Sequence, residues 1–125
     1  VATSDFSERR DLCKILSVGA DKWSSRKLWS AAYKTDNFVG ATGSGDCSIA
    51  GFLRALSLGM APDMALKAAV CAGWQNVQKA DALSGIKSWD ETLRIIKFAD
   101  IKTFDPELSR TDWIYDKKMK IWEKQ

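Results

Sequence analysis

The sequence predicts an α/β fold, in which a few strands within residues 13–40 are followed by three or four helices packed on them. Short apolar runs lie in the first part of the chain, and apolar residues at helical spacing follow in the remainder. A glycine-rich stretch over residues 39–46 separates the two regions. With 125 residues, 46% of them hydrophobic, the chain is long enough for one domain with a sizeable core.

The first region contains the expected strands. Residues 7–16 are predicted to begin as a short charged helix, and residues 13–18 form an apolar run typical of a strand, which residues 19–21 end. Residues 27–34 are the second expected strand. Three glycines within residues 39–46 then indicate a sharply bent loop.

Helices are expected from this loop onward. The first carries an apolar stripe, at i, i+3, i+4 and i+7, made of Ile49, Phe52, Leu53 and Leu56. Gly59 is a natural stop, and Pro62 suits the first turn of a second helix. The small and apolar residues expected on the buried side of that helix, which suggest close packing against a neighbour, are Leu66, Ala69, Val70, Gly73 and Val77.

Two later signals complete the expected helices. Ser88 and Glu91 have the spacing of a capping box for a third helix that carries Leu93 and Ile96. A fourth helix is expected to start at residues 105–106, and the tail over residues 113–122 is predicted to be helical. No linker that would divide the chain into two domains is found.

Charge and hydropathy exclude two classes of partner. The net charge is +3, from 19 basic and 16 acidic residues, which is too small to indicate nucleic-acid binding. The lysines of residues 117–120 lie among acidic residues and are interpreted as a solvated face. The longest uncharged stretch, residues 68–78, is far shorter than the roughly 20 residues that span a bilayer, so no membrane partner is expected.

The number and spacing of cysteines and the lack of histidine limit the kinds of catalytic and metal site that the chain can form. The three cysteines form no C-x-x-C pair, which predicts neither a disulfide framework nor a zinc site. Reduced thiols are typical of a cytoplasmic protein. The chain has no histidine, which excludes Ser-His-Asp and Cys-His catalytic units and histidine-ligated metals. Cys47 is therefore interpreted as a small buried thiol.

The turn formed by Gly43, Ser44, Gly45 and Asp46 opens directly into a helix. The first N–H groups of a helix lack intrahelical partners and attract anions, and glycines allow a phosphate to approach the backbone closely. The Asp46 carboxylate is placed to accept the proton of an attacking hydroxyl. The alternative is a tight turn in which Asp46 serves as a cap. The spacing matches neither a Walker A loop nor a dinucleotide-binding glycine motif.

The wider stretch, residues 42–53, closely resembles the second signature of the PfkB (ribokinase-like) carbohydrate kinases, which pairs a Gly-Ala-Gly-Asp turn with a helix containing Ala-Gly-Phe. Residues 65–72 resemble the next, alanine-rich helix of that family, and residues 17–19 resemble its strand-end Thr-Leu-Gly. The resemblance implies the C-terminal part of a ribokinase-like fold, whose strands join a larger and mostly parallel sheet.

The resemblance also implies an activity. Members of the family transfer the γ-phosphoryl group of ATP, with Mg²⁺, to a sugar or nucleoside hydroxyl. Asp46 matches the catalytic base, and the backbone of Gly43, Ser44 and Gly45 matches the anion hole. Ser17 and Gly19 match the segment that lies along the nucleotide, and residues 70–74 fall near the adenine. Trp74 and Trp89 themselves are interpreted as packing residues.

The sequence departs from the family at two points. Gly40 stands where the family often has an aspartate of a monovalent-cation site, and no Asn-x-x-Glu motif is found in the chain. The acceptor-binding half of the family fold precedes the region matched here. The sequence is therefore interpreted as the nucleotide-side, C-terminal portion of a kinase, with negligible activity alone because the acceptor is not held.

The sequence leaves two functions open. The first is ATP-dependent phosphoryl transfer within a complete kinase. The second is a non-catalytic interaction or nucleotide-binding module in which the glycine turn is only a helix entry. An exposed Asp46 in an open groove favours the first, and a buried Asp46 satisfied as a cap favours the second. A homo-oligomer formed through the aromatic tail or an exposed sheet edge is left open.

Overall fold

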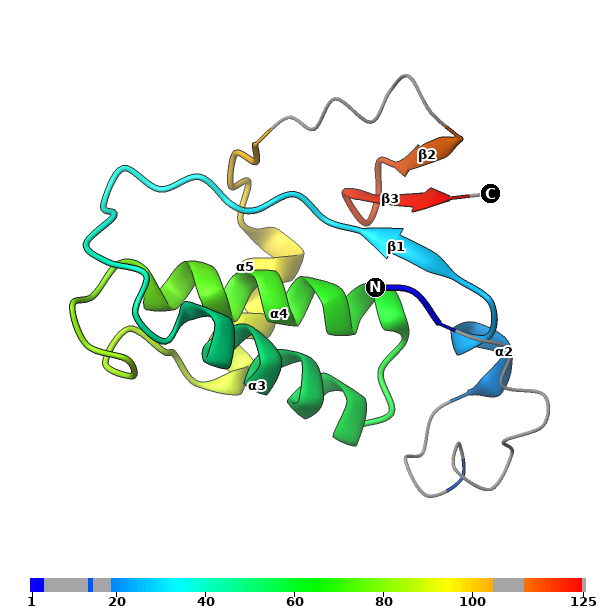
Figure 1. The fold of residues 1–125 in the computed structure, drawn as a ribbon, viewed down its shortest axis with the longest axis horizontal. Coiled ribbons are helices and arrows are strands. Elements are labelled where there is room, and N and C mark those ends of the chain that lie inside the picture. Colours follow the sequence, from blue (N-terminus) through cyan, green and yellow to red (C-terminus); the bar gives the residue numbers. More distant parts are fainter. Residues whose placement is uncertain (4–13, 15–18, 105–111, 125) are drawn as a thin grey trace.

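The computed structural model describes residues 1–3, 14, 19–104 and 112–124. Within this part the chain forms a mixed α/β structure of four helices and one three-stranded antiparallel sheet (Figure 1). The elements are α2 (Ala20–Trp23), β1 (Lys27–Trp29), α3 (Ser44–Ser57), α4 (Pro62–Asn76), α5 (Trp89–Phe98), β2 (Trp113–Asp116) and β3 (Ile121–Lys124). The predicted α/β class is confirmed in this general form.

The sheet has the order β1-β3-β2, and β3 pairs antiparallel with both neighbours. Two of its strands come from the chain's end, so the predicted helix over residues 113–122 is wrong. Trp122 lies opposite Trp29 on one side and Tyr115 on the other, where the rings of Tyr115 and Trp122 are 4.9 Å apart. Such aromatic cross-strand pairs favour a sheet over a helix.

The turn between β2 and β3 is fixed by a side chain. The Asp116 Oδ1 atom accepts hydrogen bonds from the N–H groups of Lys118, at 2.8 Å, and Met119, at 3.1 Å. Lys120 has a positive φ of 51° as the chain reverses. Because an aspartate that binds the backbone two and three residues ahead competes with helix formation, the tail folds as a hairpin.

The expected strand over residues 27–34 is shorter than predicted, since β1 ends at Trp29. The chain then continues without regular structure, except that Tyr33 forms an isolated bridge with Thr103. The strand expected over residues 13–18, the helix expected within residues 7–16 and the helix expected from residue 105 lie outside the described residues, apart from Lys14.

Helices α3 and α4 pack closely through small residues. The buried positions of α3 are Cys47, Gly51 and Ala55, whereas Ile49 and Leu53 are 61% and 54% exposed. The predicted stripe is therefore wrong for these two side chains. A Cβ atom on Gly51 would lie 2.7 Å from the carbonyl oxygen of Ala68, so the backbones approach more closely than larger residues permit.

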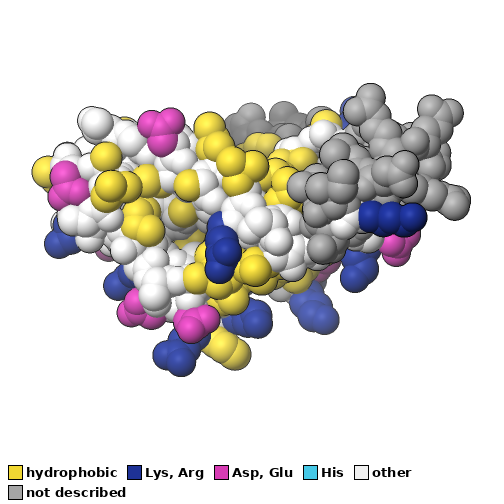
Figure 2. All heavy atoms as spheres, turned by 90° about the horizontal axis from the view of Figure 1, so that it is seen from below, with side chains coloured by type: hydrophobic (Ala, Val, Ile, Leu, Met, Phe, Trp, Pro, Cys, Tyr) yellow, Lys and Arg dark blue, Asp and Glu magenta, His cyan; other side chains and the backbone are white. Residues whose placement is uncertain are grey.

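The helix ends follow their local signals. Gly59, with a φ of 68°, ends α3, and Pro62 opens α4. The Ser88 hydroxyl accepts from the Glu91 N–H, and the Glu91 carboxylate accepts from the Ser88 N–H, so the predicted capping box of α5 is confirmed. On the face viewed in Figure 2, hydrophobic side chains reach the surface among charged ones. Within the described part, no helix is long and apolar enough to cross a membrane.

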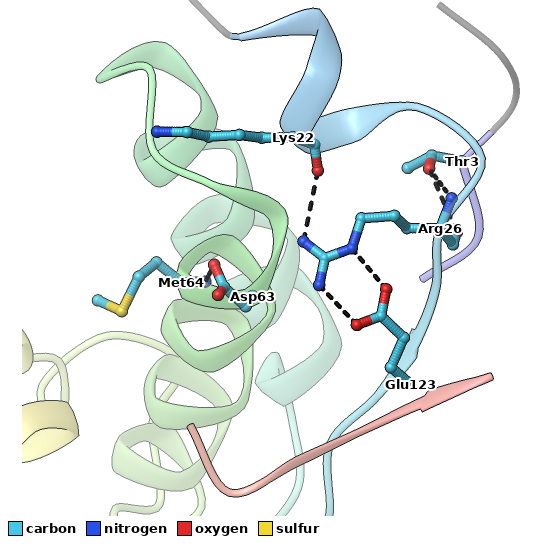
Figure 3. Close-up of polar contacts among 6 residues, drawn as sticks. All are labelled: Thr3, Lys22, Arg26, Asp63, Met64 and Glu123. Atoms are coloured by element: carbon cyan, nitrogen blue, oxygen red, sulfur yellow. Dashed lines mark hydrogen bonds and ion pairs between the residues drawn. The ribbon is translucent and has the colours of Figure 1, made fainter. Parts of the chain in front are cut away.

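The N-terminal segment, β1 and β3 are joined by polar contacts (Figure 3). The Arg26 guanidinium binds the Glu123 carboxylate through two hydrogen bonds, of 2.6 and 2.8 Å, and the Arg26 N–H donates to the Thr3 hydroxyl. The hydrogen bond from Arg26 lowers the pKa of Glu123. Such a paired fork is more specific in geometry than a single contact, and it fixes β3 beside β1.

Candidate functional site

The N-terminus of α3 presents backbone donors for which the described residues supply no acceptor. Gly43 precedes the helix in the left-handed conformation, with a φ of 78°. The Ser44 N–H donates to the Ala41 carbonyl, at 3.1 Å. Among the described residues, no acceptor binds the N–H groups of Gly45 and Asp46. Of the residues predicted to form the anion hole, Gly45 has an open N–H group and Ser44 does not, and the neighbouring Asp46, predicted as the base, has a second open N–H group.

A pocket of about 560 Å³ lies beside this helix end. Ser44, Gly45 and Ser48 of α3 form part of its wall. The remaining wall is largely apolar and comes from α4 and from the loops around Tyr33 and Thr103, with the residues Val70, Gly73, Trp74, Val77, Tyr33, Phe38 and Phe104 among its members. The glycine turn and residues 70–74, both of which the family resemblance assigns to nucleotide binding, therefore each contribute residues to the wall of this cavity.

The aromatic side chains of the pocket are held in place by a hydrogen bond and by contacts with neighbouring side chains. The indole N–H of Trp74 donates to the Lys34 carbonyl at 3.0 Å, and the rings of Trp74 and Tyr33 meet edge to face at 6.0 Å. The Lys34 ammonium lies 5.3 Å from the centre of the Phe104 ring. Burial raises the pKa of Tyr33 to about 12, so this phenol stays neutral at physiological pH. Trp74 packs as predicted, and it also lines the cavity.

Asp46 is exposed, and no described residue hydrogen-bonds its carboxylate. It follows Ser44, a residue of the pocket wall, by two positions, which corresponds to about 200° around the helix. Asp46 is therefore not a buried cap, the outcome that would have favoured a purely structural turn. Asp46 itself is not part of the pocket wall, although Gly45 beside it is.

Cys47 is buried, and its thiol donates to the Ala82 carbonyl at 3.3 Å. Burial, together with the charge of Asp46, raises the pKa of this thiol. A thiol held neutral is a poor nucleophile, which agrees with the prediction of a small packing residue.

The other segment predicted to lie along the nucleotide is described only at Gly19. Ser17 lies outside the described residues. The carbonyl of Gly19 accepts from the Lys22 N–H at 3.1 Å, ahead of α2, and Gly19 is not part of the pocket wall. Gly40 donates to the Val77 carbonyl, which places the loop before α3 against the end of α4.

Three aromatic members of the wall are not predicted from the sequence: Tyr33, Phe38 and Phe104. Each lies outside the helices and strands, where no periodic pattern marks it. Tyr33 and Phe104 are brought together because residues 33 and 103 pair in an isolated bridge. Tyr33 and Phe38 stand shortly before the glycine turn in the sequence, which could have indicated them, whereas Phe104 has no such signal.

The described residues contain no cluster of three metal-binding side chains. Mg²⁺ in phosphoryl-transfer sites is usually held by one or two carboxylates together with phosphate oxygens and water. Asp46 is the carboxylate of the turn, so it fits a Mg²⁺ ion that arrives with a nucleotide but does not by itself form a metal site.

Comparison of the chain with protein-family models, with curated proteins and with solved structures gives no match.

A buried lysine, Lys67, lies next to the ring of Tyr33. Lys67 of α4 is 3% exposed, and its ammonium donates to the Ser30 hydroxyl at 3.1 Å and to the Lys120 carbonyl at 2.7 Å. It also lies 5.7 Å from the centre of the Tyr33 ring. Burial, with a smaller contribution from Lys120, lowers the pKa of Lys67 to about 8.

The free energy of unfolding is expected to rise as the pH increases from about 8 toward 9. Over this interval the folded protein has released the Lys67 proton, whereas the unfolded chain, with an ordinary lysine pKa of 10.5, still holds it. Above pH 9 the buried Cys71, with its pKa raised to about 11, opposes the rise, because the unfolded thiol ionises first. Urea denaturation at a series of pH values measures this profile.

The matched comparison is Lys67→Met. The N-terminal ammonium of Val1, whose pKa burial lowers from 8.0, acts in the same direction near pH 8 and is common to both proteins. The difference between the two profiles therefore isolates Lys67. Parallel profiles between pH 8 and pH 9 would show that Lys67 titrates normally in the folded protein.

Proposed function

We propose that this chain forms the nucleotide-binding side of an ATP-dependent kinase of the PfkB (ribokinase-like) type, which phosphorylates a sugar or nucleoside hydroxyl. The observation that carries the proposal is that Gly45, whose N–H group has no acceptor among the described residues, lies in the wall of an aromatic pocket. Such a wall combines the two chemistries that a nucleotide requires, an apolar surface for its base and anion-binding donors for its phosphates.

The dimensions of the pocket support a nucleotide. Its volume of about 560 Å³ lies within the range of roughly 300–1,000 Å³ typical of small-molecule sites. Tyr33, Trp74 and Phe104 offer ring surfaces to a base. From there a polyphosphate would extend toward Gly45, where the helix dipole favours negative charge.

The position of Asp46 supports phosphoryl transfer. In an in-line displacement the attacking oxygen and the leaving oxygen lie on opposite sides of the transferred phosphoryl group. A nucleotide in the pocket would contact the wall formed by Ser44, Gly45 and Ser48, whereas Asp46 does not line the pocket. Its carboxylate would accept the proton of the acceptor hydroxyl, and Mg²⁺ bound with the nucleotide would neutralise phosphate charge.

A nucleotide-binding module without transfer is the second candidate, and it is favoured by the lack of any described hydrogen-bond partner for the Asp46 carboxylate. No described residue contacts the Asp46 carboxylate through a hydrogen bond, so nothing in the described part orders an acceptor beside it. Transfer without a held acceptor loses a contribution of about 7–11 kcal/mol from proximity. The chain alone is therefore expected to bind nucleotide with negligible turnover.

Nucleotide binding is tested by titrating the chain with ATP and Mg²⁺ and following tryptophan fluorescence and heat release. Gly45→Asp is expected to weaken ATP binding about tenfold or more, because the new carboxylate repels the phosphates at the open N–H groups. A side chain at Gly45 meets no atom within 4 Å, so the variant should fold.

The matched control is Gly40→Asp, since Gly40 also has open space around an added Cβ and does not line the pocket. It adds the same charge and is expected to bind ATP nearly as the unmodified chain does. Equal ATP affinity in Gly45→Asp and in the unmodified chain would reject the proposed phosphate position. Absence of binding at millimolar ATP would reject the function itself.

A further inference from the structure

A second, polar pocket of about 150 Å³ lies where α4, the end of α5 and the turn between β2 and β3 meet. Its charged wall residues are mostly basic and come from three separate elements of the fold: Lys67, Lys97, Lys118 and Lys120, with Asp100 as the one acidic member. The volume is several times the roughly 30 Å³ that a water molecule occupies. The pocket is therefore large enough for a small polyatomic ion.

The charges in this pocket do not balance among the described residues. Asp100 is already paired, since its Oδ1 atom lies 2.8 Å from the Lys120 ammonium. Lys67 is 3% exposed, and its hydrogen-bond acceptors at Ser30 and Lys120 are neutral oxygens. No described carboxylate lies within ion-pair distance of Lys67. Buried charges in proteins are ordinarily paired, so this ammonium lacks the counter-charge that burial calls for.

The exposed lysines at the rim and the end of α5 indicate which kind of ligand would supply the missing negative charge. Lys97 and Lys118 are exposed at the rim and add positive charge. The carbonyl oxygens at the end of α5 carry partial negative charge, which Lys97 in the last turn offsets. An anion that accepts several hydrogen bonds from ammonium groups fits this wall better than a cation or an apolar group.

We propose that this pocket binds a phosphate-sized oxyanion, with Lys67 as its buried donor and Lys97 and Lys118 as donors at the rim. The site is separate from the nucleotide pocket and does not depend on the proposed kinase function. Tyr33 lines both cavities, so the two sites share one wall.

Thermal unfolding of the chain in sodium phosphate and in sodium chloride of equal ionic strength, at pH 7, tests the proposal. Phosphate is expected to raise the melting temperature relative to chloride. Lys67→Met is expected to remove this difference, and Lys22→Met, which deletes an exposed lysine on α2, is expected to keep it.

Gly45→Asp separates the two anion sites. If phosphate binds in the lysine pocket, it stabilises Gly45→Asp as much as the unmodified chain. If the effect is lost in Gly45→Asp and retained in Lys67→Met, phosphate binds only at α3 and the inference is wrong. The absence of any phosphate-specific stabilisation in the unmodified chain would also overturn it.

A second measurement covers the case in which Lys67→Met does not fold. The double variant Lys97→Met, Lys118→Met alters only exposed side chains, and it is expected to lower phosphate affinity about tenfold. In the unmodified chain labelled with ¹³C-lysine, the Lys67 Cε resonance is expected to shift as phosphate is added. An unchanged Lys67 resonance together with full affinity in the double variant would refute the site.

Discussion

Replacing Asp46 by Asn is expected to lower the rate of ATP-dependent phosphorylation about 10²- to 10⁴-fold in a protein that joins this chain to an acceptor-binding half. Loss of a positioned general base has this magnitude in other enzymes. The amide preserves the size of the side chain and cannot take up the proton. Because Asp46 lies outside the pocket wall, the affinity for ATP is expected to change little. Single-turnover phosphorylation and ATP titration measure the two effects separately.

Asp90→Asn is the matched control, because Asp90 lies in the first turn of α5 as Asp46 lies in the first turn of α3. Each substitution removes one carboxylate beside a helix N-terminus. The control is expected to retain normal turnover. If Asp46→Asn transfers phosphate at the rate of Asp90→Asn, Asp46 is not the base, and the second candidate, a nucleotide-binding module without transfer, is favoured.

The second large effect is expected at the contact between α3 and α4. Gly51→Val should lower the free energy of unfolding by about 3 kcal/mol, at the upper end of typical overpacking costs. Its Cβ atom would lie 2.7 Å from the Ala68 carbonyl oxygen and 3.0 Å from the Ala72 Cβ atom. Backbone atoms cannot rotate away, so the two helices must separate. Urea denaturation followed by circular dichroism measures the loss.

Gly45→Ala is the corresponding control in the same helix. A Cβ atom at Gly45 meets nothing within 4 Å, and alanine reduces the backbone freedom of the unfolded chain. This variant is expected to be as stable as the unmodified chain or slightly more so. A Gly51→Val protein with an unchanged unfolding midpoint would show that α3 and α4 are not packed as closely as the structure has them.

The boundaries of α3, α4 and α5 were predictable because their signals are local. Gly59, Pro62 and the Ser88–Glu91 capping box act within one turn of the residues they govern, and each ends or begins a helix where expected. The stripe on α3 was less predictable. Which face of a helix is buried depends on the neighbour it meets, and α4 offers alanines that select Gly51 and Ala55 over the larger Ile49 and Leu53.

The sheet was not predictable from local pattern for the opposite reason. β3 pairs with β1, and the paired residues Lys124 and Lys27 stand far apart in the sequence. The same applies to the site. The glycine turn and Asp46 stand together in the sequence, whereas Tyr33 and Phe104 reach the pocket through a bridge between distant segments. Residues joined by long-range pairing carry no local mark of it.

The ion pair between Arg26 and Glu123 spans 97 positions and has a consequence for how the protein assembles. Closing so long a loop costs more entropy than closing the short connection between α3 and α4. The helix pair is therefore expected to form early and the sheet late, with slower amide exchange in α4 than in β1.

Leu28 and Ile121, each 2% exposed, are buried in the strands that this late step brings together. Removal of the last five residues would delete β3 and leave β1 without its partner. We therefore expect β1 and β3 to fold as one cooperative unit, so that residues 121–124 determine whether β1 is ordered.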